Sequence, residues 1–316
     1  MPATFAVVVS AHRMYPTLPE CLAGFRRMAA TAENVVFVDN GSPDGIGEQI
    51  SMSVPGMTCL RLDRNLYFCG GYNTGIRYAL DKGYDFVLLV NADAEVVNPD
   101  FVNELLRASV RWPRAAFLGP LVELRVRGNT QRTCLQYPSL WRQVVAWPAS
   151  RLFPQYYRKQ PAHETEVEFL NGVCVLCRCS ALRDIGLMDE TFAGYVEDAD
   201  WAWRAKSSGW SSVFVPCPSI IHHEEPVGYE QYSLKTFLLK RNTVLWFLKA
   251  DRRHSATAYA WCSLGLARLR ALSAIDPRKR ALHLTFLNRL RRAYAGLLRG
   301  EAMGSWFGPP LSLFEQ

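Results

Sequence analysis

The chain lacks any long apolar run. No window of its 316 residues reaches the roughly 18 uninterrupted apolar residues that a membrane-spanning helix needs. Residues 243–248 come nearest, and Lys240 and Arg241 precede them closely. The sequence therefore predicts no transmembrane helix. Internal repeats and low-complexity segments are also missing, and 49% of the residues are apolar, so the chain can form one large or two small globular domains.

A second cysteine cluster at zinc-finger spacing is missing as well. Nine cysteines occur, and Cys174, Cys177 and Cys179 have no matching second group. This disfavours a zinc finger. Because the cysteines are scattered among apolar segments, we expect reduced and mostly buried thiols in a cytoplasmic protein.

Acidic residues are scarce near the C-terminus. Residues 251–300 hold eleven Lys or Arg against two acids, an excess of nine positive charges; since the whole chain carries +7, the remainder carries −2. The basic residues alternate with apolar ones, and no nucleic-acid recognition motif accompanies them. We expect one or two basic amphipathic helices, interrupted near Pro277, that bind the inner leaflet of a membrane rather than nucleic acid. Packing of this tail on the catalytic domain and a dimer contact are the alternatives.

The first 125 residues alternate between strand and helix patterns. Strands are predicted over residues 5–9, 34–38, 58–62, 85–90 and 116–124, and helices over 19–30, 74–82 and 99–110. Such alternation predicts right-handed crossovers and a parallel sheet covered on both faces. This stretch therefore predicts a Rossmann-like half.

The pattern changes after residue 125. Residues 125–164 suggest long loops that shape a pocket. A strand pair is then predicted over 167–178 with its turn near Asn171, followed by helices over 180–185 and 198–207 and a strand over 210–221.

Two acidic motifs carry the chemistry. Asn91-Ala92-Asp93-Ala94 follows the apolar run 86–90, and Glu197-Asp198-Ala199-Asp200-Trp201 precedes His222-His223. The run 86–90 is typical of a strand buried on both faces, so Asp93 should lie at the carboxyl edge of the sheet, where such folds bind ligands. The simpler interpretations are a helix cap at Asp93 and acids that complement a helix dipole at 197–200.

The order of several motifs resembles family 2 glycosyltransferases, and most of all their rhamnosyltransferase-like branch, over residues 4–250. These motifs are Val7-Val8-Val9-Ser10, Val38-Asp39-Asn40-Gly41-Ser42, residues 64–73, Asn91-Ala92-Asp93, Glu197-Asp198-Ala199-Asp200 and His222-His223. The resemblance implies a GT-A fold, with a Rossmann-like, mostly parallel central sheet flanked by helices and a C-terminal helical extension. It also implies inverting, metal-dependent transfer of a sugar from a nucleoside diphosphate.

The resemblance assigns the nucleotide-sugar contacts. Asp39 would accept the imide N–H of uracil or thymine; the alternative is an Asx turn that bonds the backbone of Gly41 or Ser42. Gly71 would let the backbone approach the ligand closely. The other donor-binding residues implied are Ser10, Arg64, Asn65, Asn73, Asn91 and Arg241.

Metal ligation is also implied by the resemblance. Asp93 corresponds to the last acid of the DxD motif that holds Mg²⁺ or Mn²⁺ on the diphosphate, while Asn91 stands where the first acid would be. His222 corresponds to a third ligand, with a hydrogen-bonded structural histidine as the alternative. If the strand continues, His223 points to the opposite face.

Inverting transfer needs a carboxylate that takes the proton of the acceptor hydroxyl. By its place in the motif Asp198 is the candidate base, with Glu197 second, while Asp200 caps or orients. The metal, with Lys240 or Arg241, would carry the charge of the leaving diphosphate. Trp201 and Trp203 either stack on a sugar or belong to the core.

We therefore expect a catalytic domain over residues 1–250 and a basic helical tail over 251–316. Residues 1–125 form the nucleotide-sugar half and residues 126–250 the acceptor half. The function expected is transfer of rhamnose from dTDP-rhamnose, or of a hexose from a UDP-sugar, to a polyprenyl-diphosphate-linked or polysaccharide acceptor. The protein would be cytoplasmic and peripheral to the cytoplasmic membrane.

Two rival functions remain open at this point. A GT-A scaffold without activity would explain Asn91 in place of an acid. A sugar-nucleotide pyrophosphorylase shares a related sheet, but residues 10–15 lack the Gly-rich basic loop that such enzymes use on a triphosphate.

Overall fold

The computed structural model describes residues 3–13, 18–27, 32–98, 100–124, 129–130, 132–146, 160–223 and 234–301. They divide into two compact units. The first comprises Met1–Tyr137, Arg158–Ala193 and Glu197–Glu225, and the second Pro138–Tyr157, Gly194–Val196 and Pro226–Gln316. The predicted end of the first helix, residues 28–30, and much of the predicted pocket loop lie outside the described residues.

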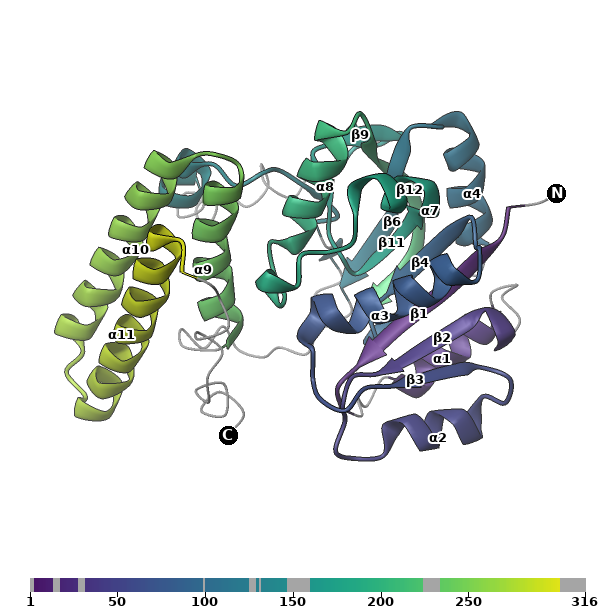
Figure 1. Cartoon of the computed structure of the whole chain (residues 1–316), viewed down its shortest axis with the longest axis horizontal. Coiled ribbons are helices and arrows are strands. Elements are labelled where there is room, and N and C mark those ends of the chain that lie inside the picture. Colours follow the sequence, from purple (N-terminus) through teal and green to yellow (C-terminus); the bar gives the residue numbers. More distant parts are fainter. Residues whose placement is uncertain are drawn as a thin grey trace. The chain divides into compact units, whose positions relative to one another are not determined.

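The first unit is built on one large mixed sheet with the strand order β3-β2-β1-β4-β11-β6-β12-β5 (Figure 1). Its strands are β1 (Phe5–Ala11), β2 (Val35–Asp39), β3 (Thr58–Arg61), β4 (Phe86–Val90), β5 (Ala94–Val96), β6 (Ala115–Leu124), β11 (Cys174–Arg178) and β12 (Ser211–His222). The first four are parallel neighbours. β11 is antiparallel to both β4 and β6, and β12 runs parallel to β6.

Short strands extend this architecture. β7 (Asn129–Thr130) pairs with β6, and β9 (Thr165–Val167) pairs with β12. β8 (Cys134–Leu135) and β10 (Phe169–Leu170) form a separate two-stranded sheet. The predicted strand pair at 167–178 is therefore not a hairpin, because its two halves bond to different partners.

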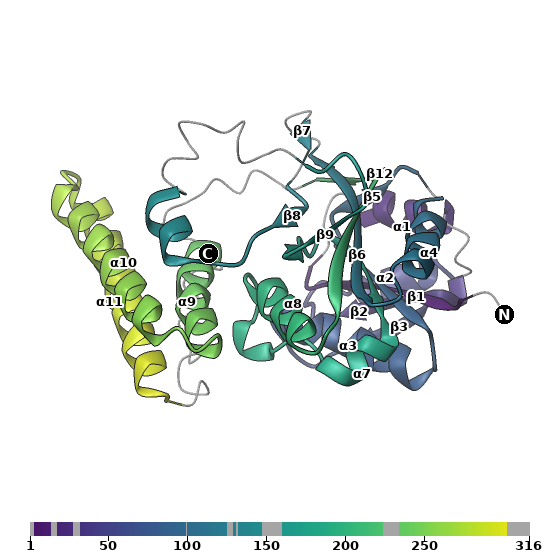
Figure 2. The ribbon, with the colours of Figure 1, turned by 90° about the horizontal axis from the view of Figure 1, so that it is seen from above.

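Helices cover both faces of the large sheet (Figure 2). They are α1 (Leu18–Arg27), α2 (Ile46–Ser53), α3 (Tyr67–Asp81), α4 (Phe101–Arg111), α7 (Cys179–Ile185) and α8 (Glu197–Ser207), with short turns η1 (Ala32–Asn34) and η3 (Glu190–Phe192). Val7 and Val9 belong to the core shared with α1, α2 and α4. Val8 faces α3 instead, since a Cβ on Gly75 would lie 2.3 Å from its side chain. This two-sided burial explains the unbroken apolar runs of β2 and β4.

The second unit is helical. It contains η2 (Arg142–Ala146), α9 (Leu234–Lys249), α10 (Arg253–Ser273) and α11 (Pro277–Arg299). Phe237 of α9 packs on Phe286 of α11 at 6.5 Å between ring centroids, and the Tyr294 hydroxyl lies 3.1 Å from Ser263 Oγ. Helix α9, which precedes the expected boundary at residue 250, thus belongs to the same compact unit as α10 and α11.

The sequence predicted no transmembrane helix and mostly buried, reduced cysteines. Within the part of the chain that is described, no helix is long and apolar enough to cross a membrane. All nine cysteines are free and six of them are buried. Free, mostly buried thiols are thereby confirmed.

Candidate active site

The carboxyl end of β2 positions Asp39. Its side chain is fully buried, and in the sheet it lies between Ala11 of β1 and Arg61 of β3. Oδ1 accepts a hydrogen bond from the backbone N–H of Ser42 at 2.8 Å, as an Asx turn requires. Oδ2 accepts no hydrogen bond from the described residues and has only the Nε of Arg61 at 3.9 Å. One oxygen therefore makes the turn, while the other remains an acceptor.

Asn40, which the sequence analysis did not assign to the site, connects this turn to the start of α3. Its Oδ1 accepts from Leu66 N, and its Nδ2 donates to the carbonyl of Tyr67, each at 2.8 Å. A Cβ on Gly71 would lie 2.3 Å from Ser10 Oγ and 2.7 Å from Asn40 Nδ2. Protein side chains therefore crowd Gly71, and its approach to a ligand stays a prediction. Ser10 and Gly71 are therefore brought together at this edge.

Arg64 and Asn65 lie in the connection that enters α3. Arg64 is exposed, and its backbone passes so close to Gly41 that a Cβ there would lie 2.3 Å away. Asn65 Oδ1 accepts from the N–H of Tyr67 at 2.7 Å. Asn65 thus serves as a helix-entry residue, which explains why α3 begins seven residues before the predicted helix start.

Two asparagines of the predicted donor site make hydrogen bonds within the fold. Asn73 donates to the carbonyl of Met188 and to Glu190 Oε1, and accepts from Met188 N. These bonds join α3 to the 188–190 segment, and a contact of Asn73 with the donor stays a prediction. Asn91 Oδ1 accepts from the Tyr72 hydroxyl at 3.2 Å, yet Asn91 stays partly exposed at the end of β4.

Arg241 belongs to α9 of the second unit, where it is buried. Burial also lowers the pKa of the neighbouring Lys240. A role for either residue in holding the diphosphate stays a prediction.

The end of β12 brings His222 to Asp93. Here β12 pairs antiparallel with β5, and His222 lies opposite Ala94. His222 Nε2 lies 3.2 Å from Asp93 Oδ1, whereas His223 Nε2 lies 2.9 Å from Glu95 Oε2. The two histidines therefore contact different acids. Because β12 ends at His222, the strand does not continue through His223, and their placement on opposite faces of a strand stays a prediction. His222 is therefore the histidine that could bind a metal ion together with Asp93.

This pair fits part of a divalent cation's coordination shell. Among the described residues no group of three or more His, Cys, Asp or Glu side chains could hold a metal. Asp93 and His222 supply one carboxylate and one imidazole, with side chains 28% and 8% exposed. Substrate phosphates and water would have to complete the shell, which is the usual arrangement for Mg²⁺ and also suits Mn²⁺.

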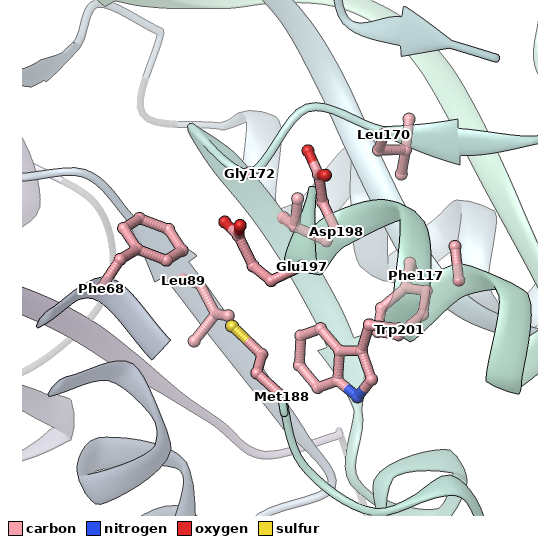
Figure 3. A pocket seen from close by; sticks show the side chains of 11 residues that line it. Phe68, Leu89, Phe117, Leu170, Gly172, Met188, Glu197, Asp198 and Trp201 are labelled. Atoms are coloured by element: carbon pink, nitrogen blue, oxygen red, sulfur yellow. The ribbon is translucent and has the colours of Figure 1, made fainter. Parts of the chain in front are cut away.

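The start of α8 presents two adjacent carboxyl groups at an apolar pocket. Glu197 points toward Phe68 and Asp198 toward Gly172 (Figure 3). The space in this pocket, part of which is open solvent, is about 420 Å³. Its lining is Phe68, Leu89, Phe117, Leu170, Gly172, Val175, Met188, Glu197, Asp198, Trp201 and Ala202. Apart from the two carboxyl groups, the lining side chains are apolar.

The apolar surroundings change the acidity of both groups. Burial raises the pKa of Asp198 to about 7, although bonds from the backbone, including Ala199 N at 2.8 Å, oppose the rise. Burial, followed by the charge of Asp198, raises the pKa of Glu197 well above its usual range. Glu197 Oε2 has no hydrogen-bond partner among the described residues. A carboxyl with a pKa near 7 is well matched to proton transfer at neutral pH.

Asp200 orients α8, in line with one of its predicted roles. Its Oδ2 lies 2.9 Å from Arg204 Nε, and Arg204 also donates to the carbonyls of Ile185 and Leu187. These bonds tie α8 to the segment that follows α7.

The tryptophans of α8 are anchored in the first unit. Trp201 Nε1 donates to the carbonyl of Gly186, and its ring packs on Phe117 at 4.7 Å between centroids. Trp203 meets Tyr137 edge-on at 5.3 Å. Trp201 therefore belongs to the core, and its ring also forms a wall of the pocket, whereas Trp203 is only half-buried.

Comparison with known sequences identifies relatives. Residues 6–186 match the family described as Glycosyl transferase family 2. The N-acetylglucosaminyl-diphospho-decaprenol L-rhamnosyltransferase of Mycobacterium tuberculosis is 32% identical over 238 residues, which cover 69% of this chain and 75% of that protein.

Solved structures with the same fold are more distant in sequence. The mannosyltransferase PcManGT from Pyrobaculum calidifontis, in complex with GDP-Man and Mn²⁺, aligns with a TM-score of 0.55 at 15% identity, over 96% of this chain and 89% of that one. S. aureus TarS 1–349 in complex with UDP-GlcNAc aligns with a TM-score of 0.54 at 14% identity, over 95% and 84%. At these identities the likeness shows the fold alone.

Proposed function

The chain belongs to glycosyltransferase family 2 and has a GT-A fold, and from this premise we propose that it is an inverting, metal-dependent transferase that moves a sugar from a nucleoside diphosphate to a lipid-linked acceptor. The observation that carries the proposal is the pair of adjacent carboxyl groups at an apolar pocket, with Glu197 buried and Asp198 partly exposed. Membership of the family sets aside the pyrophosphorylase alternative.

The two carboxyl groups differ in acidity, so we assign them different roles. The pKa of Glu197 is raised well above its ordinary value by burial and by the charge of Asp198, while the pKa of Asp198 is raised to about 7, so Asp198 is the group to which we assign titration near neutral pH. Asp198 accepts the proton of the acceptor hydroxyl while that oxygen attacks the anomeric carbon. The bond from the anomeric carbon to the diphosphate oxygen breaks on the opposite face, which inverts the configuration.

The leaving group departs as a nucleoside diphosphate. Asp93 and His222 would hold the divalent cation, which supplies positive charge to the departing diphosphate. At the other end of the donor, Asp39 Oδ2 is a buried acceptor with no hydrogen bond from the described residues. It suits the imide N–H of uracil or thymine, so the proposal favours UDP or dTDP.

Rhamnose from dTDP-rhamnose is the donor sugar we favour over a hexose. The relative in M. tuberculosis is named an L-rhamnosyltransferase. The apolar side chains of Phe68, Met188 and Trp201 lie beside the carboxyl pair. They would contact the methyl group of a 6-deoxy sugar, whereas the extra hydroxyl of a hexose would lack a hydrogen-bond partner there. An apolar pocket rejects an added hydroxyl by about 10²-fold at most, so the preference would be measurable but not absolute.

The acceptor we propose is a sugar on a polyprenyl diphosphate, because the relative's name describes such a substrate. The enzyme would then act in the cytoplasm, peripherally at the cytoplasmic membrane, with its basic C-terminal helices toward anionic lipid. A polysaccharide acceptor is the alternative.

Calorimetric titration with UDP and with dTDP, each with and without Mn²⁺, tests the donor site. We expect metal-dependent binding of one nucleotide in the wild type and its loss in Asp93→Ala. Glu95→Ala is the matched control, because Glu95 contacts His223 instead of His222. Binding of neither nucleotide would contradict the donor site. Tight binding without transfer to or hydrolysis of any nucleotide sugar would instead favour an inactive scaffold.

A further inference from the structure

The two helices α10 and α11 form a hairpin (Figure 1), and apolar side chains near its end are exposed to solvent. We call residues 266–284 the hairpin tip. Ile275, in the turn between the helices, is 98% exposed, and Leu269 and Leu272 are 65% and 59% exposed. The other exposed large apolar residues of the tip are Leu266, Leu282 and Leu284. No residue between 272 and 285 is buried. Exposed apolar groups gathered in this way mark an interaction surface.

The same tip is strongly basic. Its charged residues are Arg268, Arg270, Asp276, Arg278, Lys279 and Arg280, so it carries a formal charge of +4. The single acid is used within the fold, because Asp276 Oδ1 accepts from Arg278 N at 2.9 Å and caps α11. Pro277 follows at the first helical position. The Asp276 cap and Pro277 therefore fix the turn that exposes Ile275.

The positive charge of the hairpin tip favours a negatively charged partner over a second copy of this chain. A second copy meeting the tip in a symmetric contact would place +4 against +4, which is repulsive. A suitable partner has an apolar layer that can bury the leucine side chains and negative charges that can pair with the arginines. The interface of a bilayer with anionic lipids has both properties.

We propose that the hairpin tip docks on an anionic membrane surface, inserting Leu269, Leu272 and Ile275 among the lipid chains while its basic residues contact lipid phosphates. The proposal rests on the proposed function, since it would place the transferase at the surface that holds a lipid-linked acceptor. It adds the residues that make the contact.

Co-sedimentation with vesicles tests the proposal. The vesicles contain equal parts of phosphatidylglycerol and phosphatidylcholine, or phosphatidylcholine alone, and no nucleotide is present. We expect wild type to bind the anionic vesicles more strongly, and Ile275→Glu to weaken that binding at least ~10-fold, because a charge replaces the group that inserts. Val110→Glu is the matched control, since Val110 is 80% exposed on α4 of the first unit.

A second variant separates the charge from the apolar contact. Replacing Arg278, Lys279 and Arg280 by Gln keeps good helix formers in α11 and removes three charges. We expect binding to anionic vesicles to fall at least ~10-fold, by the loss of attraction that three basic residues provide. The control replaces the exposed Lys82, Arg107 and Lys206 by Gln, which lowers the net charge equally.

Several outcomes would overturn the proposal. Wild-type binding by Ile275→Glu or by the charge variant would do so, as would equal binding to both kinds of vesicle. If light scattering showed a wild-type dimer that Ile275→Glu splits, with vesicle binding unchanged, the tip would be a contact between copies. Nucleotide titration is independent of these measurements, so failure at the membrane and failure of the proposed function can be told apart.

Discussion

At the scale of single residues, the acidity of Asp198 links activity to stability. Its pKa is raised to about 7 by burial, so the folded state favours the neutral acid. The ordinary value of 3.8 applies to the unfolded chain. The stability contributed by the neutral acid is therefore complete below about pH 4 and is lost as the pH rises through about 7. Catalysis needs the opposite form, since only the carboxylate accepts a proton.

Asp198→Asn should therefore change activity and stability in opposite directions. We expect turnover to fall by about 10²- to 10⁴-fold because the base is gone, while nucleotide binding persists. Thermal unfolding should show the variant more stable than wild type at pH 8, with the advantage disappearing toward pH 4. Asp81→Asn removes one exposed charge and is the control.

Two results would contradict this assignment. Turnover unchanged in Asp198→Asn would exclude the residue as the base, and Glu197→Gln would then be the next variant to assay. A stability difference that stays constant between pH 4 and pH 8 would show that ionisation of Asp198 does not destabilise the fold.

Some individual residues of the candidate site could be predicted from the sequence and others could not. That His222 and His223 contact different acids could be predicted, because adjacent side chains of an extended segment point apart. The hydrogen bonds of Asn73 could not be foreseen, because Met188 and Glu190 are distant in the sequence and only tertiary packing brings them together. Asn40 had a visible signal in its turn motif, but its link to the start of α3 depends on the same packing.

At the scale of elements, the strands were predicted better than the helix starts. Strands β1, β2 and β4 are apolar runs whose pattern is local. Helix α2 was missed, and α3 was predicted to start late because Gly70 and Gly71 resemble a loop. The structure shows why glycines occur there. Both positions are crowded, by Leu66 at 2.5 Å from a Cβ on Gly70 and by Ser10 at 2.3 Å from a Cβ on Gly71.

Alanine at Gly71 tests this packing. Gly71→Ala should destabilise the protein by about 1–3 kcal/mol, because the added methyl group collides with Ser10 and Asn40. Nucleotide affinity should fall as well, since Asn40 holds the edge beside Asp39. Gly265→Ala is the control in α10, where a Cβ would meet nothing within 4 Å; it should stabilise by about 0.5–1 kcal/mol. Chemical denaturation compares the two, and a gain in stability for both would refute the crowding argument.

At the scale of the whole molecule, the chain order differs from the division into units. Residues 194–196 group with the helical unit although they directly precede Glu197. The sequence predicted two consecutive domains, since hydrophobic patterns show neither that α9 packs with α10 and α11 nor that a short segment belongs with them. The backbone of this segment is unusual, with φ of 66° at Tyr195 and 74° at Val196. Such conformations cost about 1–3 kcal/mol each and persist only where surrounding contacts impose them.

Asn242 of α9 supplies those contacts and should control the geometry that enters α8. Its buried Nδ2 donates to the carbonyls of Gly194 at 2.8 Å and Tyr195 at 2.7 Å. In Asn242→Ala the turn loses both hydrogen bonds. Because Glu197 follows Tyr195 by only two residues, the carboxyl pair would be displaced. We therefore expect kcat to fall at least ~10-fold, with KM for the nucleotide sugar nearly unchanged. Adding Val196→Gly should recover part of the lost stability, because glycine adopts a positive φ without strain. If unfolding shows lower stability while kcat is unchanged, Asn242 supports only the helical unit and has no part in positioning Glu197 and Asp198.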